Sequence, residues 1–183
     1  MKKRLFIAIF PPENVLKKIQ SFQEDIHSEN VKLTQKQNLH ATLAFFGSVS
    51  SKKQQRIENC ISSCAQKIKK HVATVSLNPL FLPSKKHATV IALPINKNNT
   101  LSNIYSCITK GLGKEEKKEF LPHVTIGRSK KIITKEAMQR INNDQKETTI
   151  TFAVEKIVLV ESQLQKEGSQ YTILRKWKLH EKS

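Results

Sequence analysis

The sequence is short of acidic residues, of cysteines and of long apolar segments. Of its 183 residues 15 are acidic, against 32 lysines and arginines, and aromatic residues make up 6%. The apolar run near the N-terminus, Leu5 to Phe10, precedes two prolines and a glutamate, which argues against a signal peptide. No stretch approaches the length that spans a bilayer. We therefore expect a soluble, cytoplasmic protein with no membrane partner.

Three cysteines, Cys60, Cys64 and Cys107, cannot form a complete set of disulfides. Cys60 and Cys64 are four residues apart in a helix-like segment, a spacing that fits half of a metal site. No second pair of cysteines or histidines with ligand spacing completes such a site. We therefore expect buried, reduced thiols and no bound metal.

The formal net charge of +17 is the strongest compositional signal. It favours a polyanionic partner, because surface lysines and arginines gain affinity by displacing counterions from phosphates. However, 27 of the 32 basic residues are lysines, many of them in pairs along the chain, and such pairs also serve simply to solvate a surface. Charge alone therefore leaves both interpretations open.

Hydrophobic periodicity predicts alternating strands and helices. Helix-like spacing runs from Val15 to Ile26, over 52–70, from Leu101 to Leu112, and in a short segment that Thr134 caps. Strands are expected at 4–10, 38–47 (closed by Gly47), 71–82, 87–95, 120–128, 149–162 and 171–179, the last two joined by a polar turn at 165–170. No low-complexity linker divides the chain. We expect one α+β domain over residues 1–183 with two similar halves.

Two of the expected strands carry the same polar pair, His-x-Thr. These are His40-Ala41-Thr42 and His123-Val124-Thr125. In an extended strand, residues i and i+2 point to the same face, so each histidine shares a face with its threonine. Such a face is costly to bury in a core, because an imidazole and a hydroxyl need partners there. The pattern is reasonable if both polar faces line one cleft.

Six histidines and twelve threonines give about 0.4 His-x-Thr triplets by chance, and the sequence has three. The third, His87-Ala88-Thr89, follows two lysines, whereas an apolar or proline residue precedes the other two histidines. We therefore interpret His87 as a histidine near solvent at a strand entrance. Structural or solvated roles are expected for the remaining histidines, His27, His71 and His180.

Two histidines that converge on a phosphodiester form an efficient acid–base pair. Because imidazole titrates near neutrality, one ring can accept a proton from water while the other donates to the leaving oxygen. Each threonine hydroxyl can donate to a non-bridging phosphate oxygen. This chemistry requires no metal or cofactor.

The sequence resembles the 2H phosphoesterase superfamily, which is named for two such motifs, and within it the RNA 2′,3′-cyclic phosphodiesterases, also called 2′-5′ RNA ligases. "NLHATLAFFG" and "FLPHVTIGR" are similar to the two motifs. "RLFIAIFPPENVLKKI" is similar to the opening strand and helix, and "VLVESQLQKEGSQYTIL" to the C-terminal strand pair. The resemblance runs nearly from end to end. One departure is "SKKHATVIALP", where relatives tend to carry an arginine–proline pattern.

The resemblance implies a bilobal α+β fold with pseudo-twofold symmetry and one motif in each lobe, around a central groove. It implies hydrolysis of RNA 2′,3′-cyclic phosphate ends to 2′-phosphates, without metal or nucleotide cofactor. His40 would be the general acid, His123 the base, and Arg128, with Thr42 and Thr125, would bind the phosphate. We expect a monomer that acts on RNA ends or oligonucleotides.

Three alternatives stay open at this stage. The same residues could serve a 2′-5′ linkage phosphodiesterase or ligase, or a phosphodiesterase of small cyclic nucleotides. A non-catalytic RNA-binding module is the third, and two titrating groups argue against it.

Overall fold

The computed structural model describes residues 2–26, 30–97, 99–113, 119–143, 149–165 and 168–181. Its helices are α1 (Glu13–Glu24), α2 (Ser51–Ala65), α3 (Asn99–Gly111) and α4 (Lys135–Asn143), with a short 3-10 helix at Lys36–Asn38. The strands are β1 (Lys3–Ile9), β2 (Val31–Leu33), β3 (Ala41–Val49), β4 (His71–Ser76), β5 (Leu80–Leu82), β6 (Val90–Pro94), β7 (His123–Ser129), β8 (Thr149–Val154), β9 (Lys156–Gln165) and β10 (Gly168–Lys178). His27, for which a structural or solvated role was expected, lies outside the described residues. So does part of the turn expected at 165–170.

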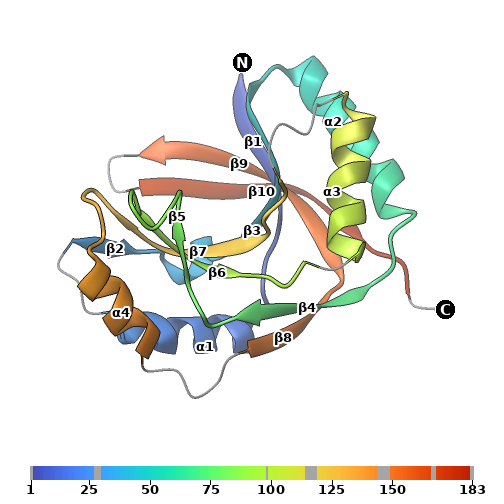
Figure 1. Ribbon diagram of the computed structural model, residues 1–183. Coiled ribbons are helices and arrows are strands. Elements are labelled where there is room, and N and C mark those ends of the chain that lie inside the picture. Colours follow the sequence, from blue (N-terminus) through green and yellow to red (C-terminus); the bar gives the residue numbers. More distant parts are fainter. Residues whose placement is uncertain are drawn as a thin grey trace.

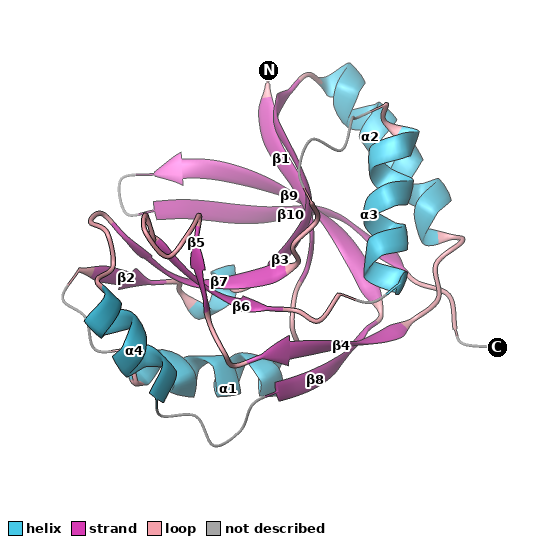
Figure 2. Ribbon diagram, in the orientation of Figure 1, coloured by secondary structure: helices cyan, strands magenta, loops and turns pink. Residues whose placement is uncertain are grey.

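The helices and strands form an α+β architecture, and the main sheet consists of two halves (Figure 2). The strand order is β10-β9-β1-β3-β7-β6-β5, with β2 also paired to β7. In the described part of the chain, β3 and β7 are paired at one position, Ala41 opposite Val124. We call β1, β3, β9 and β10 the first half-sheet and β2, β5, β6 and β7 the second. Each half-sheet therefore contains one of the two motif strands.

The helices cover the two halves on different sides (Figure 1). Helices α2 and α3 pack on each other beside the first half-sheet, with α3 against β3 and α2 against β10. Helices α1 and α4 lie beneath the second half-sheet. The separate two-stranded sheet, in which β4 pairs with β8, lies next to α1. In α1 the buried residues Val15, Ile19 and Phe22 follow helical spacing, as the sequence predicted. The two lobes therefore share one continuous hydrophobic core.

The cysteine expectation is wrong in part. Cys64 of α2 and Cys107 of α3 form a disulfide, with their Cα atoms 5.9 Å apart, and Cys60 is the free thiol among the three. The pairing joins two helices whose packing brings together residues 43 positions apart in sequence, so counting and local spacing could not reveal it. Cys60 packs closely against the end of α3: a Cβ on Gly111 would lie 2.5 Å from its Sγ.

Several element boundaries also differ from the expectations. Strand β3 begins at Ala41, after the 3-10 helix, and continues to Val49. Gly47 therefore does not end the strand; it lies within it at φ +67° and is paired with Leu5 beside a bulge. The expected strand 149–162 is two strands, because β8 pairs with β4 whereas β9 pairs with β1 and β10. The helix expected over 52–70 ends at Ala65.

Across the residues that are described, no helix has both the length and the apolar character required to cross a membrane.

Candidate active site

The four motif residues lie on one face of the main sheet, where the half-sheets meet. Because β3 and β7 are antiparallel, the pairing of Ala41 with Val124 sets His40 across from Thr125 and Thr42 across from His123. Ala41 and Val124 are fully buried in the main core, so the motif side chains point to the opposite face. All four are partly buried. The two expected pairs are thus brought together.

A β-bulge follows each motif threonine at the same place. On β3, Thr42 pairs with Ala8 and Ala44 pairs with Ile7, so Leu43 is skipped. On β7, Thr125 pairs with Ala92 and Gly127 pairs with Ile91, so Ile126 is skipped. In both half-sheets, an alanine of the neighbouring strand therefore pairs with the motif threonine. An isoleucine of that same strand forms the next pair beyond the bulge. This matching register is the structural form of the expected pseudo-symmetry.

The second bulge sets the direction of Arg128. With regular alternation, a residue three positions after Thr125 would point to the opposite face, into the core. Instead Ile126 and Gly127 are both buried, and Arg128 is exposed. A Cβ on Gly127 would lie 2.8 Å from Val31 Cγ1, so β2 packs closely against this position. The bulge thereby turns Arg128 to the face of Thr125.

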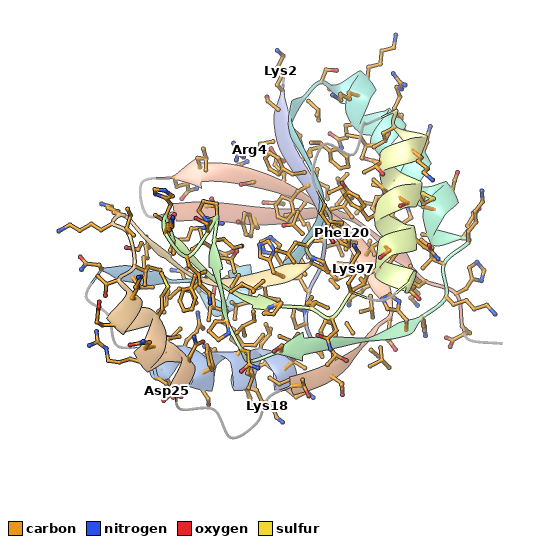
Figure 3. The ribbon with its side chains drawn as sticks, viewed as in Figure 1. Lys2, Arg4, Lys18, Asp25, Lys97 and Phe120 are labelled. Atoms are coloured by element: carbon orange, nitrogen blue, oxygen red, sulfur yellow. A yellow bond between two sulfur atoms is a disulfide. The ribbon has the colours of Figure 1, made fainter. Side chains whose placement is uncertain are left out.

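In the first half-sheet, the equivalent position is occupied by Phe45. This phenylalanine is 47% exposed although its neighbours Ala44 and Phe46 are buried. The Arg4 guanidinium lies 4.7 Å from the centre of its ring. Figure 3 shows Arg4 with Lys2 at the N-terminal end of β1. The face of the sheet that carries the motif residues, here called the motif face, therefore has Arg128 on one side. On its other side it has the Phe45 ring, which Arg4 covers.

His40 is held in a well-defined environment. Its Nδ1 is 2.7 Å from the carbonyl oxygen of Asn38, and its Nε2 is 3.1 Å from Oγ1 of Thr42. The ring centres of Phe6, Phe10 and Tyr171 lie 4.9, 5.5 and 5.1 Å from that of His40. Phe6 and its neighbours form a small apolar cluster on this face, separate from the main core.

Burial lowers the pKa of His40 below its ordinary value of 6.5. The hydrogen bond to the Asn38 carbonyl opposes this shift, because it favours the charged ring. Electrostatic interactions with His123 and Arg128 lower the pKa further. These two interactions also indicate that both groups lie near His40 in space.

His123 is anchored in the same way as His40. Its Nδ1 is 2.8 Å from the carbonyl oxygen of Leu121, two residues earlier in the chain, as Asn38 is for His40. With an Nδ1–H donor, the neutral ring of each histidine leaves Nε2 as its acceptor. In both motifs, Nε2 is thus the ring nitrogen that does not bond the backbone.

The other histidines in the described part of the chain, His71, His87 and His180, do not join this site. Val90, the first residue of β6, pairs with Arg128, and Pro94 at its other end pairs with His123. His87 is exposed, as expected from its lysine-rich context. It precedes β6, so it lies beyond the end of β6 that is remote from His123. His71 Nδ1 contacts the carbonyl of Lys69, and the backbone of His180 bonds Ile68 and Lys70. No group of three or more metal-ligating side chains occurs within the described ranges.

Sequence reasoning missed the residues that enclose His40. Phe6 and Phe10 belong to the strand expected at 4–10, which the sequence analysis did not assign to the site. Tyr171 approaches from β10, far away in sequence. The available signal was weak: Phe10 stands directly before the two prolines, at the end of the strand that pairs with the first motif.

Solved structures show the same fold. The crystal structure of TT0787 from Thermus thermophilus aligns with a TM-score of 0.81 at 21% identity, covering 98% of this chain and all of that one. The apo form of Escherichia coli LigT aligns with a TM-score of 0.79 at 20% identity, covering 98% of each chain. The chain therefore has the same fold as LigT.

Sequence comparison identifies the family. An RNA 2′,3′-cyclic phosphodiesterase of Methanocaldococcus jannaschii is 34% identical over 180 residues, 95% of this chain and 99% of that protein. The family model of the 2′-5′ RNA ligase superfamily matches residues 11–166. The chain belongs to the 2′-5′ RNA ligase superfamily.

Proposed function

We propose that this protein hydrolyses RNA 2′,3′-cyclic phosphate ends to 2′-phosphates with a histidine pair and no metal. The observation that carries the proposal is the matched anchoring of His40 and His123, each through Nδ1 to the carbonyl two residues earlier, on strands that meet at Ala41 and Val124. The name of the relative from Methanocaldococcus jannaschii, an RNA 2′,3′-cyclic phosphodiesterase, supports this substrate.

In the proposed reaction, a water molecule attacks the phosphorus of the cyclic ester. His123 Nε2 accepts a proton from that water as the P–O bond forms. His40 donates a proton to the 3′ oxygen as the P–O3′ bond breaks. The products are a 2′-phosphomonoester and a free 3′ hydroxyl, and the histidines exchange their protonation states. Proton exchange with solvent returns the pair to its starting state.

The lowered pKa of His40 must be reconciled with its role as the acid. In the free protein, burial favours its neutral form, and so does the nearby Arg128 guanidinium. A bound phosphodiester adds a negative charge beside the ring, and an opposite charge nearby favours the protonated form. In this proposal, His40 therefore takes up its proton when the substrate binds. The Thr42 hydroxyl, 3.1 Å from Nε2, can accept or donate, so it accommodates both states.

Thr42, Thr125 and Arg128 bind the phosphate in this proposal. The threonine hydroxyls lie on the same face as the histidines and can donate to non-bridging oxygens. Arg128 is turned to that face by the bulge, and its planar guanidinium suits bidentate contact with a phosphate. Together they neutralise charge that builds up on the non-bridging oxygens.

The family name favours one second reaction, formation of 2′-5′ linkages. If the 5′ hydroxyl of another RNA replaces water as the nucleophile, the same P–O3′ bond breaks and a 2′-5′ phosphodiester results. The leaving oxygen and both proton transfers are unchanged. The two reactions then compete for the same bound cyclic phosphate. The outcome depends on whether water or the 5′ hydroxyl attacks the phosphorus.

The proposal is tested with an oligoribonucleotide that carries a 2′,3′-cyclic end, incubated in EDTA. We expect a 2′-phosphate as the product, identified by chromatography against 2′- and 3′-phosphate standards. A 3′-phosphate would mean that the other ester bond breaks. Loss of turnover in the chelator, restored by added metal, would contradict the metal-independent mechanism.

A further inference from the structure

Gln23 is a buried polar residue that has no role in the reaction described above. It lies in the last turn of α1, next to the apolar stripe of that helix, and it is 5% exposed. Burying an amide group is costly unless it is hydrogen-bonded. The Nε2 atom of Gln23 donates to two backbone carbonyls, that of Thr34 at 2.9 Å and that of Ile126 at 2.8 Å. Its two hydrogens therefore join α1 to the segment after β2 and to the motif strand β7.

The Ile126 carbonyl lies where β7 changes its neighbour. On one edge, β7 pairs with β3 at Val124 and with β2 from Gly127 onward, so Ile126 falls between the two pairings. On the other edge, Ile126 is the residue that the ladder with β6 skips. Its carbonyl accepts from the backbone N–H of Thr34 at 2.9 Å and from Gln23. A side chain of α1 thus supplies one of the two donors at this point.

This carbonyl belongs to the bulge that directs Arg128. A bulge interrupts the regular ladder, so its buried backbone groups need partners from elsewhere. Helix α1 lies beneath the second half-sheet (Figure 1), and Gln23 reaches from there to the backbone two residues before Arg128. An apolar side chain at position 23 would fill the space but would leave the Thr34 carbonyl without this donor. The conformation of the bulge would then be less firmly held.

We propose that Gln23 is a positioning residue for Arg128: by holding the Ile126 carbonyl, it maintains the bulge that turns the guanidinium to the motif face. The inference rests on the proposed function, in which Arg128 binds the phosphate, and it adds a buried residue of α1 to that site. Because Gln23 acts through the backbone of β7, its loss should change those properties of the site that depend on Arg128.

The position of Arg128 can be measured without a substrate, through the ring of His40. The titratable and charged groups that face this ring are His123 and Arg128 of β7 and Tyr171 of β10. Besides burial, Arg128 lowers the pKa of His40, so Arg128→Ala should shift this pKa upward in an NMR titration. Gln23→Met removes the donor but keeps an unbranched side chain, and it should shift the pKa in the same direction. In the Arg128→Ala background, Gln23→Met should cause no further shift.

The affinity for 2′-AMP, measured by titration calorimetry, gives a second readout. Gln23→Met should weaken binding by about three- to tenfold in the wild type and by less than about twofold in Arg128→Ala, because residues that act through one another are coupled. Ser62→Ala is the control, since it removes the hydrogen bond that Trp177 Nε1 of β10 donates to α2 at 2.8 Å. It should lower the free energy of unfolding but leave the 2′-AMP affinity and the pKa of His40 unchanged.

An unchanged pKa of His40 in either Gln23→Met or Arg128→Ala would overturn the inference. An equal loss of 2′-AMP affinity with and without Arg128 would also overturn it, because Gln23 would then act on the fold in general. If Gln23→Met does not fold, Gln23→Asn, whose amide is one methylene too short to reach both carbonyls, takes its place with the same expected results. If cyclic-ended RNA is not hydrolysed but the coupled shift of His40 is found, the positioning role stands and the proposed reaction fails.

Discussion

Phe45 occupies in the first half-sheet the position that Arg128 occupies in the second. Each follows its motif threonine by three residues, beyond a bulge that turns it to the motif face. The half-sheets are thus alike in register but differ in chemistry. The side with Arg128 also has Lys32, opposite it on β2, whereas the side with Phe45 has a ring covered by Arg4. In the proposed reaction, this difference distinguishes the two sides of a nearly symmetric histidine pair.

Replacing either motif histidine should nearly abolish turnover. We expect His40→Ala and His123→Ala each to lower kcat on a cyclic-ended oligoribonucleotide by at least about a hundredfold, because each removes an acid–base group. His87→Ala is the matched control: it changes the third His-x-Thr triplet, which is exposed before β6, and should stay within about twofold of the wild type. A comparable loss in His87→Ala would mean that the motifs are wrongly assigned.

Arg128 should act mainly on phosphate binding. Arg128→Ala is expected to lower kcat/KM by about ten- to a hundredfold, since charge-assisted hydrogen bonds are among the stronger ones. Arg128→Lys keeps the charge but not the bidentate geometry, so it should recover part of the loss. Steady-state kinetics at two salt concentrations measures both. Full activity in Arg128→Ala would leave the guanidinium as an ordinary surface charge.

Binding of a phosphate anion should be accompanied by proton uptake. The pKa of His40 is lowered in the free protein, and a bound anion raises it, so a proton is taken up near neutral pH. Titration calorimetry with 2′-AMP in two buffers of different ionisation enthalpy measures this number of protons. The uptake should shrink in His40→Gln. Identical heats in both buffers for the wild type would argue against His40 as the acid.

The free energy of unfolding should fall as the pH drops below about 6.5. Burial lowers the folded-state pKa of both His40 and His71 from the ordinary value of 6.5. As the pH falls, these histidines therefore become protonated in the unfolded chain before they do so in the folded protein. The folded protein loses stability over this pH range, and the loss is complete once the pH is below the folded-state pKa. Urea denaturation at pH 7.5 and 5.5 measures the difference.

The variants His40→Gln and His71→Gln should each make this loss of stability smaller. If the loss between the two pH values is as large in both variants as in the wild type, other groups are responsible for it.

The disulfide should contribute substantially to stability. Closing a loop between residues 43 positions apart is worth about 4 kcal/mol in the chain-entropy account. We expect Cys64→Ser or Cys107→Ser to lower the free energy of unfolding by a similar amount, measured in urea without reductant. Cys60→Ala, which removes the free thiol, is the control. Alkylation of three thiols in the unfolded, unreduced protein would show that no such bond forms.

The motif face could be predicted from the sequence because its signal is local. A period of two places His40 with Thr42 and His123 with Thr125 whatever the rest of the sheet does. The bulges after both threonines could not be predicted in this way, since they depend on which residue of the neighbouring strand is skipped. The exposed positions of Arg128 and Phe45 follow from those bulges, so only the arginine was expected at the site, and only through family resemblance.

Long-range partners account for most of the remaining differences. Cys64 and Cys107 meet because α2 and α3 pack together, and the break at Glu155 arises because β8 and β9 join different sheets. Neither event leaves a local mark in the sequence. Whether residues 1–183 fold as one unit stays a prediction, supported by the core that both lobes share.

The first half-sheet is completed by strands from opposite ends of the chain, with Leu5 of β1 opposite Glu161 of β9. Contacts between residues so distant in sequence form slowly, because a long loop must close before they contribute any stability. The wall around His40, which needs both Phe6 and Tyr171, is therefore absent from any nascent chain that has not yet reached β10. During synthesis on the ribosome, catalytic competence should appear late and abruptly.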